Sequence, residues 1–157
     1  ALRERTDLTV YLQGEETLAQ LIQHFREERD SCLVGTMSLW QGVDVAGAAC
    51  RLVVIDKIPF PRPDDPVSRA RSMDVERRGG NGFVSVSLTH AALMMAQGVG
   101  RLLRSTDDRG VVAILDPRVV TKRYGSFIMR SLPAMWPTTD PDVVRGALRR
   151  LAKGPDQ

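Results

Sequence analysis

The sequence is poor in the residues that build disulfide frameworks, metal sites and membrane spans. Its two cysteines, Cys32 and Cys50, form no C-x-x-C pair, and Cys32 lies in an apolar run, which predicts buried free thiols in a reducing compartment. His24 and His90 stand alone, as surface or turn histidines usually do, so no metal site is expected. Neither a signal peptide nor an apolar run of about 18 residues is present, which predicts a soluble, cytoplasmic protein.

Several catalytic patterns are missing as well. The sequence contains no G-x-x-x-x-G-K-[ST] phosphate loop, no G-x-S-x-G nucleophile turn and no H-E-x-x-H zinc pattern. The segment GVGRLL has only the first two glycines of G-x-G-x-x-G and lies within an expected helix, which disfavours a dinucleotide site. We therefore expect that this chain completes no reaction unaided.

Length and net charge limit the number of domains and the kind of partner. The 157 residues, 43% of them hydrophobic, are enough for one domain with a sizeable core and too few to argue for two. The net charge of +3 is compatible with a phosphate-bearing partner but does not by itself indicate nucleic acid.

The order of apolar segments predicts an α/β fold. Short runs rich in Val, Ile and Leu are typical of strands buried on both faces, and amphipathic helices between them favour a mostly parallel sheet. The expected strands lie in residues 8–14, 31–36, 51–59 and 110–117. The expected helices lie in 15–29, in 89–105 with Thr89 as N-cap, and in 119–132 and 140–153.

The segment 59–83 is a long excursion of the kind that tends to be functional or mobile, and four prolines in its first eight residues exclude a helix at its start. Its basic side chains would suit a phosphate backbone, and a solvated loop is an equally good interpretation. These arginines are Arg62, Arg69, Arg71, Arg77 and Arg78.

The segment AQGVGRLLRS (96–105) has two faces when it is placed on a helix. Its two glycines cost about 1 kcal/mol each relative to alanine in a helix interior, so another requirement is expected to have selected them. One face is an apolar stripe of Ala92, Met95, Ala96, Val99, Leu102 and Leu103. The other carries Gln97, Gly100, Arg101 and Arg104, which suits a polyanion, although a solvated polar face would look the same.

Four segments carry a resemblance to one family. QGVGRLLR (97–104) resembles Q-x-x-G-R-x-x-R, motif VI of superfamily two helicases, and GTMSLWQGVDVAG (35–47) resembles motif V of the DinG and XPD branch. IPFPRPDDP (58–66) and DPRVVTKRYGSFIMRSLP (116–133) look like the DinG-type pattern in the same order. The resemblance covers almost the whole chain.

The resemblance implies a RecA-like three-layer domain with a mostly parallel central sheet flanked by helices. Residues 1–157 would be the second, C-terminal motor domain, lacking its first strand and the whole first RecA-like domain. ATP with Mg²⁺ would occupy the cleft between the two domains, and the Mg²⁺ ligands would lie on the first. The family's iron-sulfur cysteines also belong to that domain, so Cys32 and Cys50 are not assigned to a cluster.

By the same resemblance, motif VI would act on the nucleotide. Arg104 would be the arginine finger and Arg101 its partner on the γ-phosphate, because phosphoryl transfer is accelerated chiefly by positioning and charge stabilisation. Gln97 would orient the attacking water or bond the phosphate, and Gly100 would keep side-chain bulk away from the nucleotide. Without the first domain, the isolated chain is predicted to have little or no ATPase activity.

Motif V would link the nucleotide to the nucleic acid. Asp44 would contact the ribose or the motif VI arginines, with a turn-forming aspartate as the alternative, and Gly42 would allow close backbone approach. Thr36 and Ser38 are candidates for single-strand phosphate contacts. Trp40 would stack on a base, although a core aromatic beneath the loop is favoured two to one. At position 41 the chain has glutamine where the family often has glutamate.

The sequence thus predicts the motor domain of a DinG-like, ATP-dependent helicase that moves along single-stranded DNA. Nucleic-acid contacts are expected at Thr36, Ser38, Trp40 and Arg62. The alternative from another class is a non-catalytic module that binds nucleic acid or a partner protein and retains the motifs. An RNA-directed relative is a third possibility, since these contacts do not distinguish the sugars.

Overall fold

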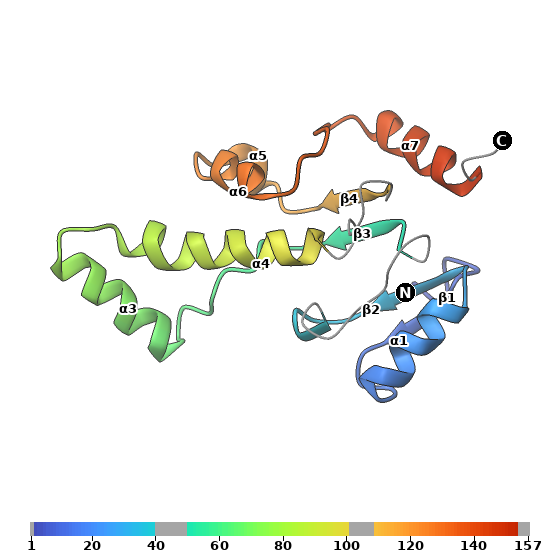
Figure 1. Cartoon of the computed structure of the whole chain (residues 1–157), viewed down its shortest axis with the longest axis horizontal. Helices are drawn as coiled ribbons and strands as arrows, with labels where there is room; N and C mark the ends of the chain where they lie inside the picture. Colours follow the sequence, from blue (N-terminus) through green and yellow to red (C-terminus); the bar gives the residue numbers. More distant parts are fainter. Residues whose placement is uncertain (1, 40–49, 101–108, 154–157) are drawn as a thin grey trace.

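The computed structural model describes residues 2–39, 50–100 and 109–153. Short strands alternate with helices along the chain, and this order confirms the predicted α/β class (Figure 1). The elements are β1 Thr9–Leu12, α1 Leu18–Glu27, β2 Ser31–Val34, β3 Leu52–Ile55, α3 Pro66–Arg77, η2 Phe83–Leu88, α4 Thr89–Val99, β4 Val111–Ile114, α5 Arg118–Thr121, α6 Gly125–Ser131 and α7 Pro141–Lys153.

The four strands form two parallel pairs. β1 pairs with β2, beginning with Thr9 opposite Ser31, and β3 pairs with β4, beginning with Leu52 opposite Val111. Both pairs are parallel, which agrees with the predicted mostly parallel arrangement and with the helical crossover between β1 and β2. The expected single central sheet is not found within the described residues, where two two-stranded sheets stand in its place.

The expectation that the strands are buried on both faces is wrong. In β3 burial alternates, with Ile55 buried while Leu52 and Val54 are 41% and 53% exposed. Residues that alternate along a strand point to opposite faces, so one face of β3 is covered and the other is open. A run of Val, Ile and Leu therefore marks the strand without showing how many of its faces are covered.

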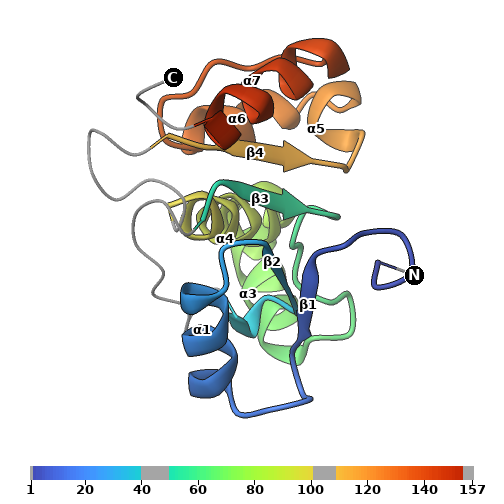
Figure 2. The ribbon, with the colours of Figure 1, turned by 90° about the vertical axis from the view of Figure 1, so that its right-hand side faces the viewer.

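The core lies between α4 and the β3–β4 sheet, and α6 closes its end (Figure 2). Helix α4 contributes a continuous buried stripe, because apolar side chains three and four residues apart share one helix face. The cluster consists of Ile55, Ile58, Leu88, Ala91, Ala92, Met95, Val99 and Ile128. By contrast, α1, which lies against β1 and β2, has Leu21 as its one buried residue.

Helix α3 lies inside the segment 59–83, whose proline-rich start, residues 59–65, is not helical, as predicted; the helix after it was not predicted. Asp65 caps the helix, its carboxylate accepting a hydrogen bond from the Ser68 N–H at 2.7 Å, and Pro66 occupies the first turn. Proline is favoured at that position, because the first-turn N–H groups have no helical partner in any case. Together α3, η2 and α4 form an arm that extends from the sheets (Figure 1).

The helix predicted for residues 89–105 starts earlier than expected. The π-helical turn η2 runs directly into α4, so Thr89 lies within helical backbone and is not an N-cap. The Thr89 hydroxyl instead donates to the Val84 carbonyl at 3.0 Å. The described part of α4 ends at Val99, and the predicted continuation to residue 105 lies outside the described residues.

The predicted helix 119–132 is divided into α5 and α6. The break falls at Lys122, whose backbone is extended (φ −104°, ψ 144°). The predicted C-terminal helix is confirmed as α7. No helix in the described ranges has both the length and the apolar character needed to cross a bilayer.

Candidate nucleic-acid interface

Thr36 and Ser38, the predicted phosphate contacts, lie together just beyond the carboxyl ends of β1 and β2. Both are exposed, and the side chain of Gln13, which follows β1, bonds to both. The Gln13 Nε2 donates to the Ser38 Oγ at 2.7 Å, and the Gln13 Oε1 accepts from the Thr36 N–H at 2.8 Å. Ligands of open parallel sheets bind outside the carboxyl ends of the strands, so the position suits a binding site.

Gln97 and Gly100 lie at the end of α4, where the sequence placed them. Gln97 is exposed, whereas Ala92, Met95 and Val99 are buried, which confirms the two-faced pattern for this part of the helix. Gly100 follows the helix with φ −62°, an angle that any residue adopts, so backbone geometry does not require glycine there. The remaining predicted site residues, Trp40, Gly42, Asp44, Arg101 and Arg104, lie outside the described residues.

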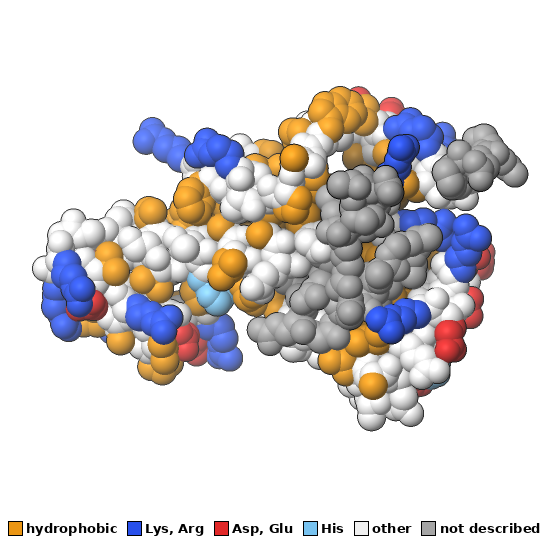
Figure 3. Space-filling view, in the orientation of Figure 1, with side chains coloured by type: hydrophobic (Ala, Val, Ile, Leu, Met, Phe, Trp, Pro, Cys, Tyr) orange, Lys and Arg blue, Asp and Glu red, His pale blue; other side chains and the backbone are white. Residues whose placement is uncertain are grey.

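Arg62 lies between β3 and α3, just before the arm begins, and is paired with Asp64. Its Nε and Nη2 donate to the two carboxylate oxygens at 3.2 and 3.0 Å, and both side chains are highly exposed. Exposed pairs of this kind contribute little to stability, so the guanidinium remains available to an anion. Arg69, Arg71, Arg77 and Arg78 are likewise exposed on or next to α3, and Lys and Arg side chains gather on the arm (Figure 3).

The comparison with known proteins identifies the family. The helicase C-terminal domain family matches residues 1–135. This chain belongs to that family. ATP-dependent helicase DinG of Mycobacterium tuberculosis is 55% identical over 153 residues, covering 98% of this chain. ATP-dependent DNA helicase YoaA of Escherichia coli K12 is 46% identical over 150 residues, or 96% of this chain.

The helicase C-terminal domain is a part of larger proteins in these relatives. This chain spans 23% of the length of the M. tuberculosis and E. coli proteins. The 3'-5' exonuclease DinG of Bacillus subtilis is 40% identical over 114 residues, which cover 73% of this chain and 12% of that protein.

At the other strand pair of this helicase C-terminal domain, a buried carboxylate joins the strand ends. Asp116 follows β4, and its Oδ2 accepts from the Ile58 N–H, beyond β3, at 3.0 Å. The Arg118 Nε donates to the same carboxylate at 2.9 Å, and the guanidinium lies 5.4 Å from the centroid of the Phe60 ring. Sequence reasoning missed this cluster, although the DPR segment was singled out.

An aromatic group extends that cluster toward the arm. The rings of Phe60, Phe83 and Tyr124 come from three separate segments, and their centroids are 5.6 to 5.7 Å apart. Such edge and tilted contacts add to the stabilisation from buried area. They fix the start of η2 against the loop between α5 and α6.

Cys32 and Cys50 are free thiols, as predicted, and burial raises the pKa of each above its usual value. Both are half-buried rather than fully buried. Among the described residues there is no group of three or more His, Cys, Asp or Glu side chains that could hold a metal ion.

Proposed function

We propose that this chain is the second, RecA-like motor domain of a DinG-type, ATP-dependent DNA helicase. The observation that carries the proposal is the 55% identity over 98% of the chain to a protein named as an ATP-dependent helicase. The four motif segments fall within the matched family region, residues 1–135. The complete protein would add a first RecA-like domain, and ATP would bind between the two.

The residues at the end of α4 suit a phosphate group. Gln97 is an exposed hydrogen-bonding side chain, and Gly100 adds no side-chain bulk next to it. In the proposal, Arg101 and Arg104 follow these residues and contact the γ-phosphate, with Arg104 as the arginine finger. A guanidinium positioned there stabilises the charge that develops on the transferred phosphoryl group. ATP supplies the phosphoryl group whose hydrolysis drives movement along the strand.

The remaining proposed nucleotide contacts come from motif V. Asp44 would bond the ribose or the motif VI arginines, and Gly42 would let the backbone approach the nucleotide. Mg²⁺ would bind together with the ATP. Its ligands would lie on the first domain.

Single-stranded DNA would cross the strand ends of β1 and β2. Thr36 and Ser38 would contact phosphates, Trp40 would contact a base or support the loop, and Arg62 would add charge just before the arm begins. The neutral donors fix the position of the backbone, and the arginines supply the salt-dependent part of the affinity.

The test uses the full-length protein and compares wild type with Arg104→Ala in single-strand-stimulated ATP hydrolysis. We expect turnover to fall by roughly 10³-fold or more while ATP binding persists, since arginine fingers contribute about 10³ to 10⁵ in rate. Arg149→Ala, an exposed arginine on α7, is the matched control and should turn over as wild type does. Unchanged turnover in Arg104→Ala would overturn the finger assignment.

The second candidate is a nucleic-acid-binding module without turnover of its own. It is favoured by the relative whose printed name is an exonuclease and not a helicase. DNA binding by the full-length protein with no DNA-stimulated ATP hydrolysis would select this candidate over the motor.

A further inference from the structure

Gln13, Thr36 and Ser38 form a closed ring of hydrogen bonds at the ends of β1 and β2. Besides the contacts already given, the Thr36 Oγ1 lies 3.1 Å from the Gln13 Oε1 and 2.9 Å from the Ser38 Oγ. Gln13 is 23 residues from Thr36 and 25 residues from Ser38 in the sequence, and the three side chains meet at one point. Gln13 was not among the residues that the sequence singled out.

The direction of each proton in the ring is fixed by chemistry. The Thr36 N–H needs an acceptor, which sets the Gln13 Oε1 toward it and leaves the Nε2 facing Ser38. The Gln13 Oε1 cannot donate, so the Thr36 hydroxyl donates to it. The Ser38 hydroxyl must then donate to the Thr36 Oγ1. Every hydroxyl proton is used inside the ring, and one Nε2 proton of Gln13 is left without a ring partner.

The backbone is shaped to hold this ring. The Gln13 N–H donates to the Val34 carbonyl at 2.9 Å, and the Leu39 N–H donates to the Thr36 carbonyl at 3.0 Å. A Cβ on Gly35 would lie 2.7 Å from the Gln13 Oε1 and 2.0 Å from the Leu39 Cδ1. Glycine at position 35 is thus what allows the carboxamide to reach the Thr36 backbone.

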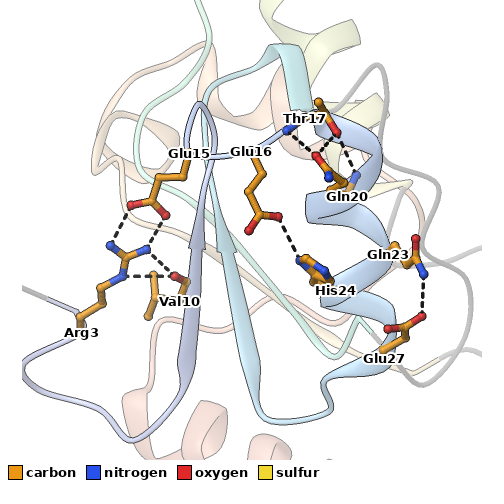
Figure 4. Close-up of polar contacts among 9 residues, drawn as sticks. All are labelled: Arg3, Val10, Glu15, Glu16, Thr17, Gln20, Gln23, His24 and Glu27. Carbon is orange, nitrogen blue, oxygen red and sulfur yellow. Dashed lines mark hydrogen bonds and ion pairs between the residues drawn. The ribbon is translucent and has the colours of Figure 1, made fainter.

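The charge next to the ring is compensated. Glu15 is two residues from Gln13, and Arg3 pairs with it, the Nη1 donating to the Oε1 at 2.8 Å (Figure 4). Arg3 also donates to the Val10 carbonyl at 2.8 Å, which holds the guanidinium beside β1 (Figure 4). Glu15, the carboxylate nearest to Gln13 in the sequence, is therefore a paired charge and not a free one.

We propose that Gln13 is a phosphate-binding residue of this domain and sets the direction of the Ser38 hydroxyl. When a phosphodiester oxygen arrives, the Ser38 proton rotates from Thr36 to the phosphate, and the free Gln13 Nε2 proton donates to the same phosphate. The Thr36 hydroxyl stays bonded to the Gln13 Oε1. One neutral hydrogen bond is exchanged for two charge-assisted ones, which are roughly twice as strong.

The ligand is the backbone of a single strand, and this inference rests on the proposed function. Both donors are neutral and read no base, so they would position a strand of any sequence. Ser38 and Thr36 are exposed and Gln13 is half-buried, and all three lie at the strand ends, where a passing chain can reach the exposed hydroxyls. Gln13 contributes a hydrogen bond to the phosphate and orients the Ser38 hydroxyl, whereas the positive charge that attracts the strand comes from arginines elsewhere.

The test measures the affinity of the full-length protein for a fluorescent oligothymidylate by anisotropy. Gln13→Met keeps the length of the side chain and removes the amide, and we expect about tenfold weaker binding. Ser38→Ala should weaken binding comparably, and the double variant should lose little more, because both act through one ring. Gln23→Met is the matched control, an exposed glutamine on α1 bonded to Glu27, and should bind as wild type does.

A second readout separates binding from a structural role. In DNA-stimulated ATP hydrolysis, Gln13→Met should raise the KM for DNA and leave kcat and the affinity for ATP alone. If Gln13→Met does not fold, as judged from thermal unfolding, Ser38→Ala carries the same comparison.

Three results would overturn the proposal, each in a different way. Wild-type DNA affinity in both Gln13→Met and Ser38→Ala would make the ring purely structural and leave the proposed function intact. Weaker binding of ATP and not of DNA would assign the phosphate to the nucleotide. Absence of DNA binding by the wild type would remove the proposed function and this inference together.

Discussion

Replacement of Asp116 offers the sharpest test of how this domain is held together. The carboxylate is 4% exposed and accepts hydrogen bonds from the backbone N–H groups of Ile58 and Arg118, each at 3.0 Å. The Arg118 guanidinium adds bonds to both carboxylate oxygens. One side chain therefore joins the segment after β3 to the segment after β4.

The size of the effect follows from what each donor loses. Asp116→Ala leaves the Ile58 N–H buried without an acceptor, which costs about 1–3 kcal/mol. The Arg118 guanidinium is 41% exposed, so water replaces much of what it loses and its contribution is discounted. We expect a total loss of about 2–4 kcal/mol in the free energy of unfolding. Asp116→Asn keeps an acceptor for Ile58 and should lose about 1–2 kcal/mol.

The dependence on pH gives an independent check. Hydrogen bonds from the Arg118 guanidinium hold the pKa of the Asp116 carboxyl well below its usual range, although burial opposes the shift. In the unfolded chain the pKa is about 3.9, so the unfolded state binds the proton more readily. The stabilisation is therefore complete above about pH 5 and declines as the pH falls through 4 toward the folded-state value.

Urea unfolding followed by circular dichroism, at pH 7, 5 and 3, measures both effects. The gap between wild type and Asp116→Asn should be full at pH 7 and 5 and smaller at pH 3. A loss below about 0.5 kcal/mol for Asp116→Ala at pH 7, or a gap that does not change with pH, would refute the reasoning.

Three further substitutions test local features by the same unfolding measurement. Gly125→Ala should cost about 3 kcal/mol or more, because its Cβ would lie 1.9 Å from the Val119 carbonyl oxygen and backbone cannot move aside cheaply. Gly146→Ala in α7, where the nearest atom is 3.6 Å away, should instead stabilise the chain by about 0.5–1 kcal/mol, and equal effects at the two glycines would contradict the contacts. Thr17→Ala removes the capping box with Gln20 and should cost about 1 kcal/mol, and no loss would mean that α1 does not depend on its cap.

The positions of the strands were predictable, and their burial was not. Apolar runs with β-branched residues mark strands wherever they lie, and all four expected strands are present. Whether a face is covered depends on what packs against it, which a local pattern does not contain. Leu52 and Val54 look like core residues in the sequence and are exposed in the structure.

Helix α3 was predictable in principle from its own start signal. The prolines before residue 66 exclude a helix at residues 59–65, where none is present, but Asp65 followed by Pro66 is a typical helix start that sequence reasoning missed. Thr89 was an error of the opposite kind. Its residue type suits an N-cap, but the preceding segment is already helical, so no free N–H groups remain there for it to cap.

Gln13 shows why a site is harder to predict than the motif that contains most of it. Thr36 and Ser38 could be found from a motif, since both lie in one segment. Gln13 joins them only because β1 pairs with β2 in the observed register, which brings together residues 25 apart. The available signal was an amide residue near the end of the expected strand 8–14, next to an expected strand, 31–36, that also ends in a polar residue.

The ends of both strand pairs are joined by the same kind of hydrogen bond, but the two sites differ in burial and in charge. A side chain after one strand accepts the backbone N–H of a residue beyond the other strand, as Gln13 does for Thr36 and Asp116 does for Ile58. Asp116 is buried and charged, and Arg118 already neutralises it, so it has no capacity for an anion. The Gln13 ring is neutral, its Thr36 and Ser38 members are exposed to solvent, and one Nε2 proton of Gln13 has no partner in the ring. Stability is thus expected to depend on the β3–β4 end of the domain, and DNA binding on the β1–β2 end. Asp116→Asn should therefore lower the free energy of unfolding with little change in DNA affinity per folded molecule. Gln13→Met should lower the DNA affinity with little change in the free energy of unfolding.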